Sequence, residues 1–194
     1  MGVLTARLRL GPVSLSDADA IASLVRIYRD PAVWAHLPEA RPVSDQAIET
    51  RLAGNARSWA ANGLDWWIVR LRGPLGGLPA GEIVGLGGVS MDGSGLDAWN
   101  LGYRLSPAAW WHGLATEIAQ ASLAAARETR PHTPVTARVL ERNPASWRVL
   151  GKVLTVAWQG VADGDDRLTA DLPRRVYTDR PLSHDMLAAL IAVV

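Results

Sequence analysis

Small residues around position 113 form a segment that could bind an anion. Gly113 and Ala115 have little or no side chain, so the main-chain N–H groups between them can approach a ligand closely. The segment follows a strand-like run and opens an Ala-rich helix, whose first-turn amides have no partners within the helix. Such a junction suits a phosphate or a pyrophosphate. Spacing alone is equally compatible with small residues that merely allow close packing.

A second segment, at residues 143–152, has the pattern of a capped helix. Asn143 stands at the N-cap and Pro144 at the first helical position, while Val149 and Leu150 supply an apolar face. Capping therefore explains Asn143 and Pro144 without any chemistry. Ser146 fits two interpretations equally well, a solvent-facing helical serine or a serine that donates a proton.

The elements that must position these segments follow from caps and hydrophobic periodicity. Helical spacing predicts helices at residues 17–30, 44–62, 113–128, 144–153 and 183–194. Apolar runs predict strands at residues 6–12, 65–71, 82–90, 98–105, 134–140, 154–161 and 175–180. The order β-α-α-β-β-β-α-β-α-β-β predicts a layered α/β (α+β) domain at 1–182, with a mixed central sheet of about seven strands flanked by helices, and a helical tail at 183–194.

Composition limits the classes of function. The 194 residues carry a net charge of +1, four histidines and no cysteine. A near-neutral chain gives no support for nucleic-acid binding, and a chain without cysteine has no disulfide, thiolate metal site or cysteine nucleophile. The histidines lack the helical pairing typical of a metal site, so no metal is expected. The sequence shows no signal peptide and no apolar stretch long enough to span a bilayer, so we expect a cytoplasmic protein with no membrane partner.

Both segments occur together in the pattern of a known family. Residues 110–115 read WWHGLA where that family has Q/R-x-x-G-x-G/A, and Asn143, Ser146 and Lys152 match a motif N-x-x-S followed by a basic residue. The chain resembles the GNAT superfamily of acyl-CoA-dependent N-acyltransferases, in its RimJ/RimL-like branch. The resemblance covers nearly the whole chain and includes the segments ARLRLGPVSLSDADA, DPAVWAHL, GEIVGLGGVS and LGYRLSPAAWWHGLATE.

Two positions depart from the family pattern. Trp111 stands where the family commonly has glycine. No glycine follows Lys152 by two residues, so the turn near Val153 is expected to differ from that of the family.

The resemblance implies an acyl-CoA site along the strand at 98–105. That strand is expected to carry a β-bulge and to splay from the strand at 134–140, which frees main-chain groups of Tyr103 and Leu105 to bind pantetheine. Amides from Trp111 to Thr116 would hold the pyrophosphate, Asn143 would bond the pantetheine arm, and Ser146 would lie near the thioester sulfur. The implied cofactor-binding set is Tyr103, Arg104, Leu105, Trp110, Trp111, His112, Gly113, Leu114, Ala115, Thr116, Asn143 and Ser146. The implied substrate-binding residues are Trp34, His36 and Asn100.

The resemblance also implies acetyl-CoA, or another acyl-CoA, as co-substrate and an amine as acceptor. The amine would attack the thioester directly, because a chain without cysteine forms no acyl-cysteine. Tyr103 and Ser146 are the implied catalytic residues. A main-chain N–H near Tyr103 would stabilise the oxyanion, and Ser146 would donate a proton to the leaving thiolate, directly or through water.

The sequence does not identify the residue that acts as general base. Asn100 stands where RimL-like sequences often have glutamate, and an amide cannot take the proton. His36, Asp97 and Tyr28 are possible substitutes through water. A lysine-type amine needs about 4 kcal/mol to lose its proton near neutral pH, and an α-amine needs less than about 1 kcal/mol. We therefore expect a peptide N-terminus or a small α-amine as acceptor.

Two further questions stay open as well. Segments 30–42 and 161–172 are expected to border the acceptor. The four aspartates of the second segment, at 163, 165, 166 and 171, would steer a cationic acceptor, although a polar hairpin loop explains them more simply.

The alternative to an enzyme is a non-catalytic acyl-CoA-binding or regulatory module on the same fold, and the chain could be a monomer or a homodimer.

Overall fold

An eight-stranded mixed sheet forms the centre of the molecule. The computed structural model describes residues 2–93, 95–161 and 172–192. The strands are β1 (Val3–Leu4), β2 (Leu8–Pro12), β3 (Trp67–Leu71), β4 (Ile83–Met91), β5 (Trp99–Leu105), β6 (Val135–Leu140), β7 (Thr155–Gly160) and β8 (Arg174–Thr178). Their order in the sheet is β1-β2-β3-β4-β5-β6-β8-β7. Within the described residues, β5 and β6 pair in parallel and the other neighbours pair antiparallel.

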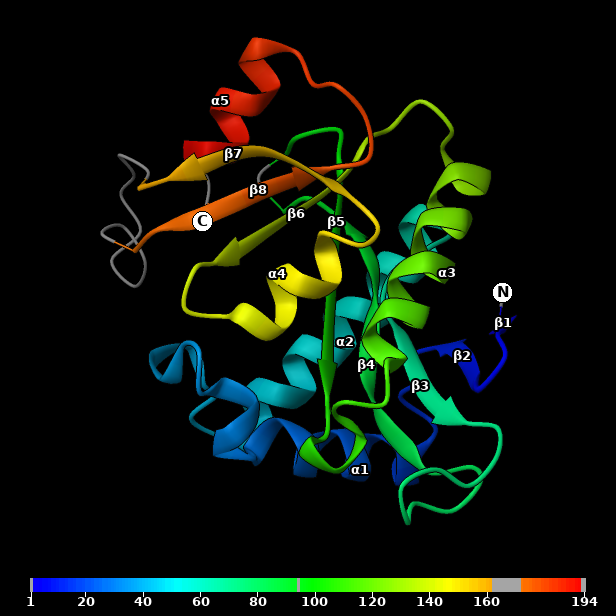
Figure 1. Ribbon diagram of the computed structural model, residues 1–194. Helices are drawn as coiled ribbons and strands as arrows, with labels where there is room; N and C mark the ends of the chain where they lie inside the picture. The colour runs from blue at the N-terminus through cyan, green and yellow to red at the C-terminus, as the bar shows by residue number, and fades with distance from the viewer. Residues whose placement is uncertain (1, 94, 162–171, 193–194) are drawn as a thin grey trace.

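Helices cover both faces of this sheet (Figure 1). Helices α1 (Ala18–Arg29) and α2 (Asp45–Asn62) lie on one face, whereas α3 (Leu114–Thr129) and α4 (Pro144–Leu150) lie on the other. Helix α5 (His184–Ala192) lies beyond the β7–β8 edge. Short 3-10 turns η1 (Pro31–Trp34) and η2 (Pro38–Ala40) connect α1 to α2, and η3 (Pro107–Ala109) follows β5.

The alternation of side chains along the strands creates two cores. On β3, Trp67 and Val69 face the α3–α4 side, and Ile68 faces the α1–α2 side. The same alternation on β5 sends Leu101 and Tyr103 toward α3 and α4. Arg104, on the other face, lies over aromatic rings of the α1–α2 side. Neighbouring residues of β5 therefore face different layers of the molecule.

The N-terminal segment ties the sheet edge to the start of α3. The Glu117 carboxylate accepts hydrogen bonds from Thr5 Oγ1 (2.5 Å), Arg7 N (2.8 Å) and Arg7 Nε (2.7 Å). Arg7 Nη1 also donates to the His112 carbonyl at 2.6 Å. These bonds fix the position of the α3 N-terminus relative to β2.

The predicted layered α/β fold is confirmed, and several boundaries differ. The sheet has eight strands rather than about seven, because the two-residue strand β1 carries too short a pattern to be recognised. Helix α4 ends at Leu150, not at 153, because the N–H groups of Lys152 and Val153 form i→i−3 bonds that tighten the chain into a turn. These bonds close the turn near Val153 without the family's glycine.

One expectation for the strand at 98–105 is wrong and another is confirmed. The β4–β5 register runs without a shift from Gly85↔Leu105 to Met91↔Trp99, so β5 carries no bulge in its pairing with β4. The splay from β6 does exist, since β6 pairs with only Trp99 and Asn100 of β5. Beyond this point β6 stays paired with β8, from Thr136 to Leu140, while β5 stays paired with β4.

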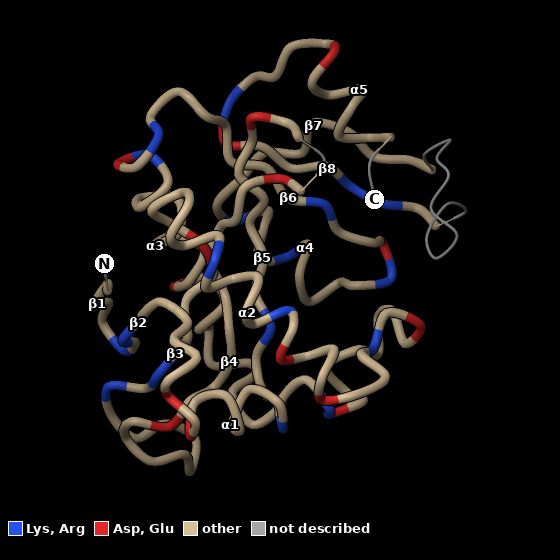
Figure 2. Tube along the Cα trace, turned by 180° about the vertical axis from the view of Figure 1, so that it is seen from behind, with Lys and Arg blue, Asp and Glu red and all other residues tan. Residues whose placement is uncertain are grey.

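The described part of the molecule shows no feature typical of a nucleic-acid, membrane or metal site. Basic and acidic positions are interspersed along the chain rather than gathered by sign (Figure 2). None of the helices in the described residues is long and apolar enough to cross a membrane. The described residues also contain no group of three or more His, Asp or Glu side chains arranged to hold a metal ion.

Candidate functional site

The divergence of β5 and β6 leaves the β6-facing edge of β5 after Asn100 without a strand partner among the described residues. Trp99 N donates to the Pro134 carbonyl on the β6 side, and Ser106 N donates to the Val84 carbonyl on the β4 side. Since main-chain groups alternate in direction along a strand, the odd-numbered residues Leu101 and Tyr103 direct theirs toward the split. An extended ligand arm can therefore add to this edge as another strand would.

The carbonyl of Leu105, predicted to bind the same arm, already has a partner. Trp110 Nε1 donates to it at 2.9 Å. The indole of Trp110 thereby links the end of β5 to the loop that precedes α3. The main-chain groups of Tyr103 remain in the split, and Leu105 contributes at most its N–H.

A cavity of about 300 Å³ occupies the split. It passes between the strands, from α4 on one face to the α1–α2 connection on the other. On the α4 side, its lining includes Tyr103, Asn143, Ser146 and Leu150. On the α1–α2 side, the lining includes His36, Trp66, Asn100 and Arg104. The other lining residues are Leu37, Leu101, Gly102, Arg138, Val139, Leu140 and Arg174. The cavity thus joins a free strand edge to two sets of polar side chains.

Tyr103 and Ser146, the two predicted catalytic residues, are brought together. The Tyr103 hydroxyl donates to the main-chain oxygen of Ser146 at 3.2 Å, and burial raises the pKa of Tyr103 to about 12. Asn143 caps α4 as predicted, because its Oδ1 accepts from Ser146 N at 3.1 Å. Among the described residues, the Asn143 amide Nδ2 has no hydrogen-bond partner.

The start of α3 has the open amides that an anion site needs. Gly113 is the N-cap with φ of +75°, and it has no side chain to cap the first turn. Trp111 also adopts the left-handed conformation, with φ of +66°, and its side chain is 86% exposed. The His112 ring points away from this turn, because a Cβ on Gly76 would lie 2.5 Å from its Nε2. The turn therefore offers main-chain donors, as predicted for Leu114, Ala115 and Thr116.

The three predicted substrate-binding residues lie on the α1–α2 side in different positions. His36 and Asn100 line the cavity. Trp34 is 3% exposed and lies behind it, where its Nε1 donates to the Tyr28 carbonyl at 2.7 Å. The Arg104 guanidinium covers the Trp34 ring at 3.6 Å from its centroid. Trp34 thus contacts Arg104 rather than the cavity itself.

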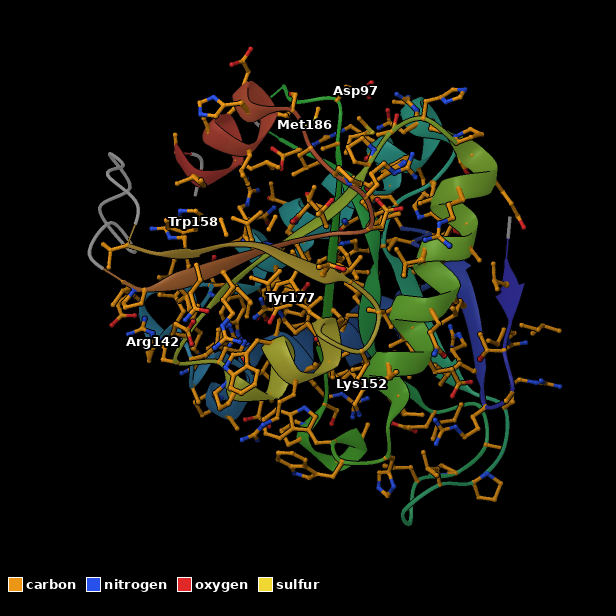
Figure 3. The ribbon with its side chains drawn as sticks, turned by 45° about the horizontal axis from the view of Figure 1, so that its top comes forward. Asp97, Arg142, Lys152, Trp158, Tyr177 and Met186 are labelled. Carbon is orange, nitrogen blue, oxygen red and sulfur yellow. The ribbon has the colours of Figure 1, made fainter. Side chains whose placement is uncertain are left out.

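His36 is neutral at physiological pH. Burial lowers its pKa to about 4, and the positive charges of Arg104 and Arg142 act in the same direction. Arg142 lies at the start of the loop between β6 and α4, and Lys152 lies beyond the far end of α4 (Figure 3). Of these two cations, Arg142 acts on His36.

The other residues weighed as bases are separated from the cavity. Asp97 is exposed, and its carboxylate contacts Thr133 Oγ1 at 3.3 Å and Arg130 Nη1 at 4.0 Å, at the opposite end of the sheet from α4 (Figure 3). Tyr28 is 1% exposed, and burial raises its pKa. The aspartates at 163, 165, 166 and 171 lie outside the described residues.

Nine of the fifteen lining residues were not predicted from the sequence, and three of these nine have a polar group in the side chain. Trp66 packs over Gly102, where a Cβ would meet its ring at 2.3 Å. Arg138 extends from β6 on the same face as Arg104 and pairs with Asp92 at 3.0 Å, and Arg174 lies opposite Leu140 on β8. The alternation of side chains along each strand could have indicated which residues share a face of the sheet, but only once the order of the strands was known.

The chain matches a family model and several solved structures. The model described as an acetyltransferase (GNAT) domain matches residues 7–153. A protein from Bordetella pertussis described as a putative GnaT-family acetyltransferase superposes with a TM-score of 0.70 at 20% identity, over 93% of this chain and 99% of the other. A GNAT-family acetyltransferase from Bacillus anthracis gives 0.72 at 18% identity, over 92% and 97%.

A third structure has a named acceptor and a bound ligand. It is RimL, the ribosomal L7/L12 α-N-protein acetyltransferase in complex with coenzyme A, with a TM-score of 0.67 at 15% identity, over 91% of this chain and 95% of the other. No curated protein matches the sequence significantly.

Proposed function

Because the chain belongs to the GNAT acetyltransferase family, whose members use acetyl-CoA, we propose that it transfers an acetyl group from acetyl-CoA to the α-amine of a peptide N-terminus or of a small molecule. The observation that carries this proposal is the cavity in the β5–β6 split. It joins an unpaired strand edge on the α4 side to a polar pocket on the α1–α2 side, so donor and acceptor can meet from opposite faces of one strand.

The donor half of the site fits an acyl-CoA. Main-chain groups of Tyr103 would bond the pantetheine arm, and the amide of Asn143 is free to do the same. The first-turn amides of α3 would hold the pyrophosphate, since several aligned N–H groups at a helix N-terminus favour a diphosphate. Bound acetyl-CoA supplies an acetyl group activated as a thioester.

The transfer itself requires few side chains. The amine attacks the thioester carbonyl carbon, the C–N bond forms while the C–S bond breaks, and the sulfur leaves as a thiolate. A main-chain N–H near Tyr103 would stabilise the charge that develops on the carbonyl oxygen. Ser146 would give a proton to the thiolate, directly or through a water, and the proton lost by the amine passes to solvent.

Among the described residues, no strong base lines the acceptor side of the cavity, and this favours a weakly basic amine. Asn100 cannot take a proton, and neutral His36 with a pKa of about 4 is a poor acceptor of one. An α-amine loses its proton near neutral pH for less than about 1 kcal/mol, against about 4 kcal/mol for a lysine side chain. This difference supports an α-amine as the acceptor.

The test is release of free CoA from acetyl-CoA in the presence of amines. With no cysteine in the chain, a thiol reagent reports CoA alone. We expect turnover with peptides and small α-amines, at kcat/KM values above those for lysine side chains or polyamines. A protein that binds CoA with heat and thermal protection, yet releases no thiol with any amine, is instead a non-catalytic acyl-CoA-binding module.

A further inference from the structure

Arg104 presents a buried cation to the acceptor side of the cavity. Its guanidinium lies 3.6 Å from the centroid of the Trp34 ring and 5.3 Å from that of Tyr28. Burial lowers the pKa of Arg104, but an arginine stays protonated in a protein. The Trp34 ring and Tyr28, whose hydroxyl hydrogen-bonds to the guanidinium, hold the planar group in place.

The hydrogen-bonding capacity around Arg104 is incomplete. Its Nε and Nη1 are buried and have no hydrogen-bond partner among the described residues, and the same holds for Nε1 of Trp66. No described carboxylate lies within ion-pair distance of Arg104. Buried donors without partners are rare in folded proteins, and a buried charge without a counter-ion is costly. Both observations are accounted for if a ligand supplies the acceptor oxygens.

The surroundings favour a negative ligand there. None of the residues lining the cavity is acidic, and Asp92, which lies nearby, is already paired with Arg138. His36 remains neutral, in part because Arg104 and Arg142 oppose its protonation. A ligand that reaches this side meets net positive charge in a site with little water, where the charge is weakly screened.

We propose that the acceptor carries a carboxylate close to its amine, and that Arg104 binds this carboxylate as the specificity-determining residue. The inference rests on the proposed acetyl transfer and names its substrate class. The carboxylate belongs either to a free amino acid or to an aspartate or glutamate side chain at a peptide N-terminus. Its charge offsets the buried cation, and two N–H groups of a guanidinium match its geometry.

The same cation helps to deprotonate the amine. Positive charge near an amine disfavours its ammonium form and lowers its pKa. Arg104 therefore does by electrostatics part of what a carboxylate base would do at position 100, where this chain has asparagine. The carboxylate of the acceptor keeps the substrate in the site against that repulsion.

The first experiment compares matched acceptors in the CoA-release assay. Tetrapeptides that begin with aspartate or asparagine form one pair, and a free amino acid and its amide form the other, with rates corrected for the fraction of neutral amine. We expect kcat/KM to be about ten- to a hundredfold higher for the carboxylate member of at least one pair. The pair that responds identifies the source of the carboxylate. Equal rates within both pairs would overturn the proposal and leave acetyl transfer intact.

The second experiment changes the cation. Arg104→Gln should lower kcat/KM for the preferred carboxylate acceptor at least tenfold more than for its neutral partner, mainly through KM, and Arg104→Lys should restore part of the preference. Arg9→Gln removes the same charge from an exposed position on β2 and should leave the preference unchanged. An equal loss for both acceptors in Arg104→Gln would contradict a role in recognition.

A binding measurement separates this proposal from the one on which it rests. The acetylated aspartyl peptide is titrated into the CoA-bound protein, with thermal unfolding of each variant as a check on folding. Binding that depends on Arg104 in a protein without turnover would leave the carboxylate site standing and refute catalysis. Turnover without any such binding or preference would do the opposite.

Discussion

The start of α3 and the Arg104 pocket both suit a negative group, and they are built differently. At α3 the donors are main-chain amides of consecutive residues around Gly113, open to solvent beside an exposed Trp111. At Arg104 the donors are side chains that β5 and the segment before β3 bring together from far apart in the chain. Water screens the first site more than the second, where the Nε and Nη1 atoms of Arg104 are buried. An exposed site therefore needs several aligned donors, whereas a buried one can select for a single charge.

The largest effect on this contrast should come from Gly113→Val. Valine is strongly disfavoured at φ of +75°, so the turn must rearrange and its amides lose their alignment. We expect the affinity for CoA, measured by calorimetry, to fall ten- to a hundredfold, or about 1.4–2.8 kcal/mol. Gly77→Val is the matched control, because Gly77 has φ of +86° with open space around it, outside the site. An equal loss of affinity in both variants would show that α3 has no special part in binding.

Glu117→Gln tests how much the hydrogen bonds between Glu117 and the N-terminal segment contribute to the free energy of unfolding. Burial opposes ionisation of Glu117, but hydrogen bonds from Thr5 and Arg7 outweigh it and hold its pKa below the usual value. Losing these charged bonds should lower the free energy of unfolding by about 1–2 kcal/mol at pH 7, since the site is partly exposed. Denaturant unfolding measures the loss, and Glu128→Gln, at the exposed end of α3, should change stability by less than about 0.5 kcal/mol.

The pH dependence of stability tests the environment of His36, which lies beside Arg104 in the buried pocket. Its folded pKa of about 4 lies below the unfolded value of about 6.5, so the unfolded chain binds more protons between these limits. Stability should therefore be highest above pH 6.5 and fall by about 1–2 kcal/mol toward pH 4, after allowance for screening of the half-buried ring. His36→Gln should flatten this part of the stability profile. An unchanged slope in the variant would mean that His36 titrates normally.

Trp111→Gly should produce the smallest change, and in the stabilising direction. Tryptophan with φ of +66° is strained, and its exposed ring loses little burial on removal. Relief of that strain exceeds the entropy cost of glycine by up to about 1 kcal/mol. Trp111→Ala retains the strain and should not raise the melting temperature. A gain in both variants would attribute the effect to the ring and not to the backbone.

The two sites also differ in how far the sequence predicts them. The α3 turn is local, so its small residues and helical pattern were sufficient to locate it, as they were for the Asn143 cap of α4. The Arg104 pocket depends on the packing of Trp34, Trp66 and β5, which are separated along the chain. Periodicity predicted the layers, and the family resemblance implied the splay of β5, but neither placed Trp66, Arg138 and Arg174 in the cavity. The bulge that the resemblance also implied is absent from the pairing of β5 with β4.

The opposite orientations of Tyr103 and Arg104 on β5 have an evolutionary consequence. The two side chains face different layers, so under the proposed roles a point substitution at one position can change donor or acceptor recognition while sparing its neighbour. An insertion or deletion of one residue within this strand would instead invert the orientation of every side chain beyond it and exchange the two roles. Divergence among descendants of this enzyme should therefore proceed by substitution within β5, with length changes confined to the loops on either side.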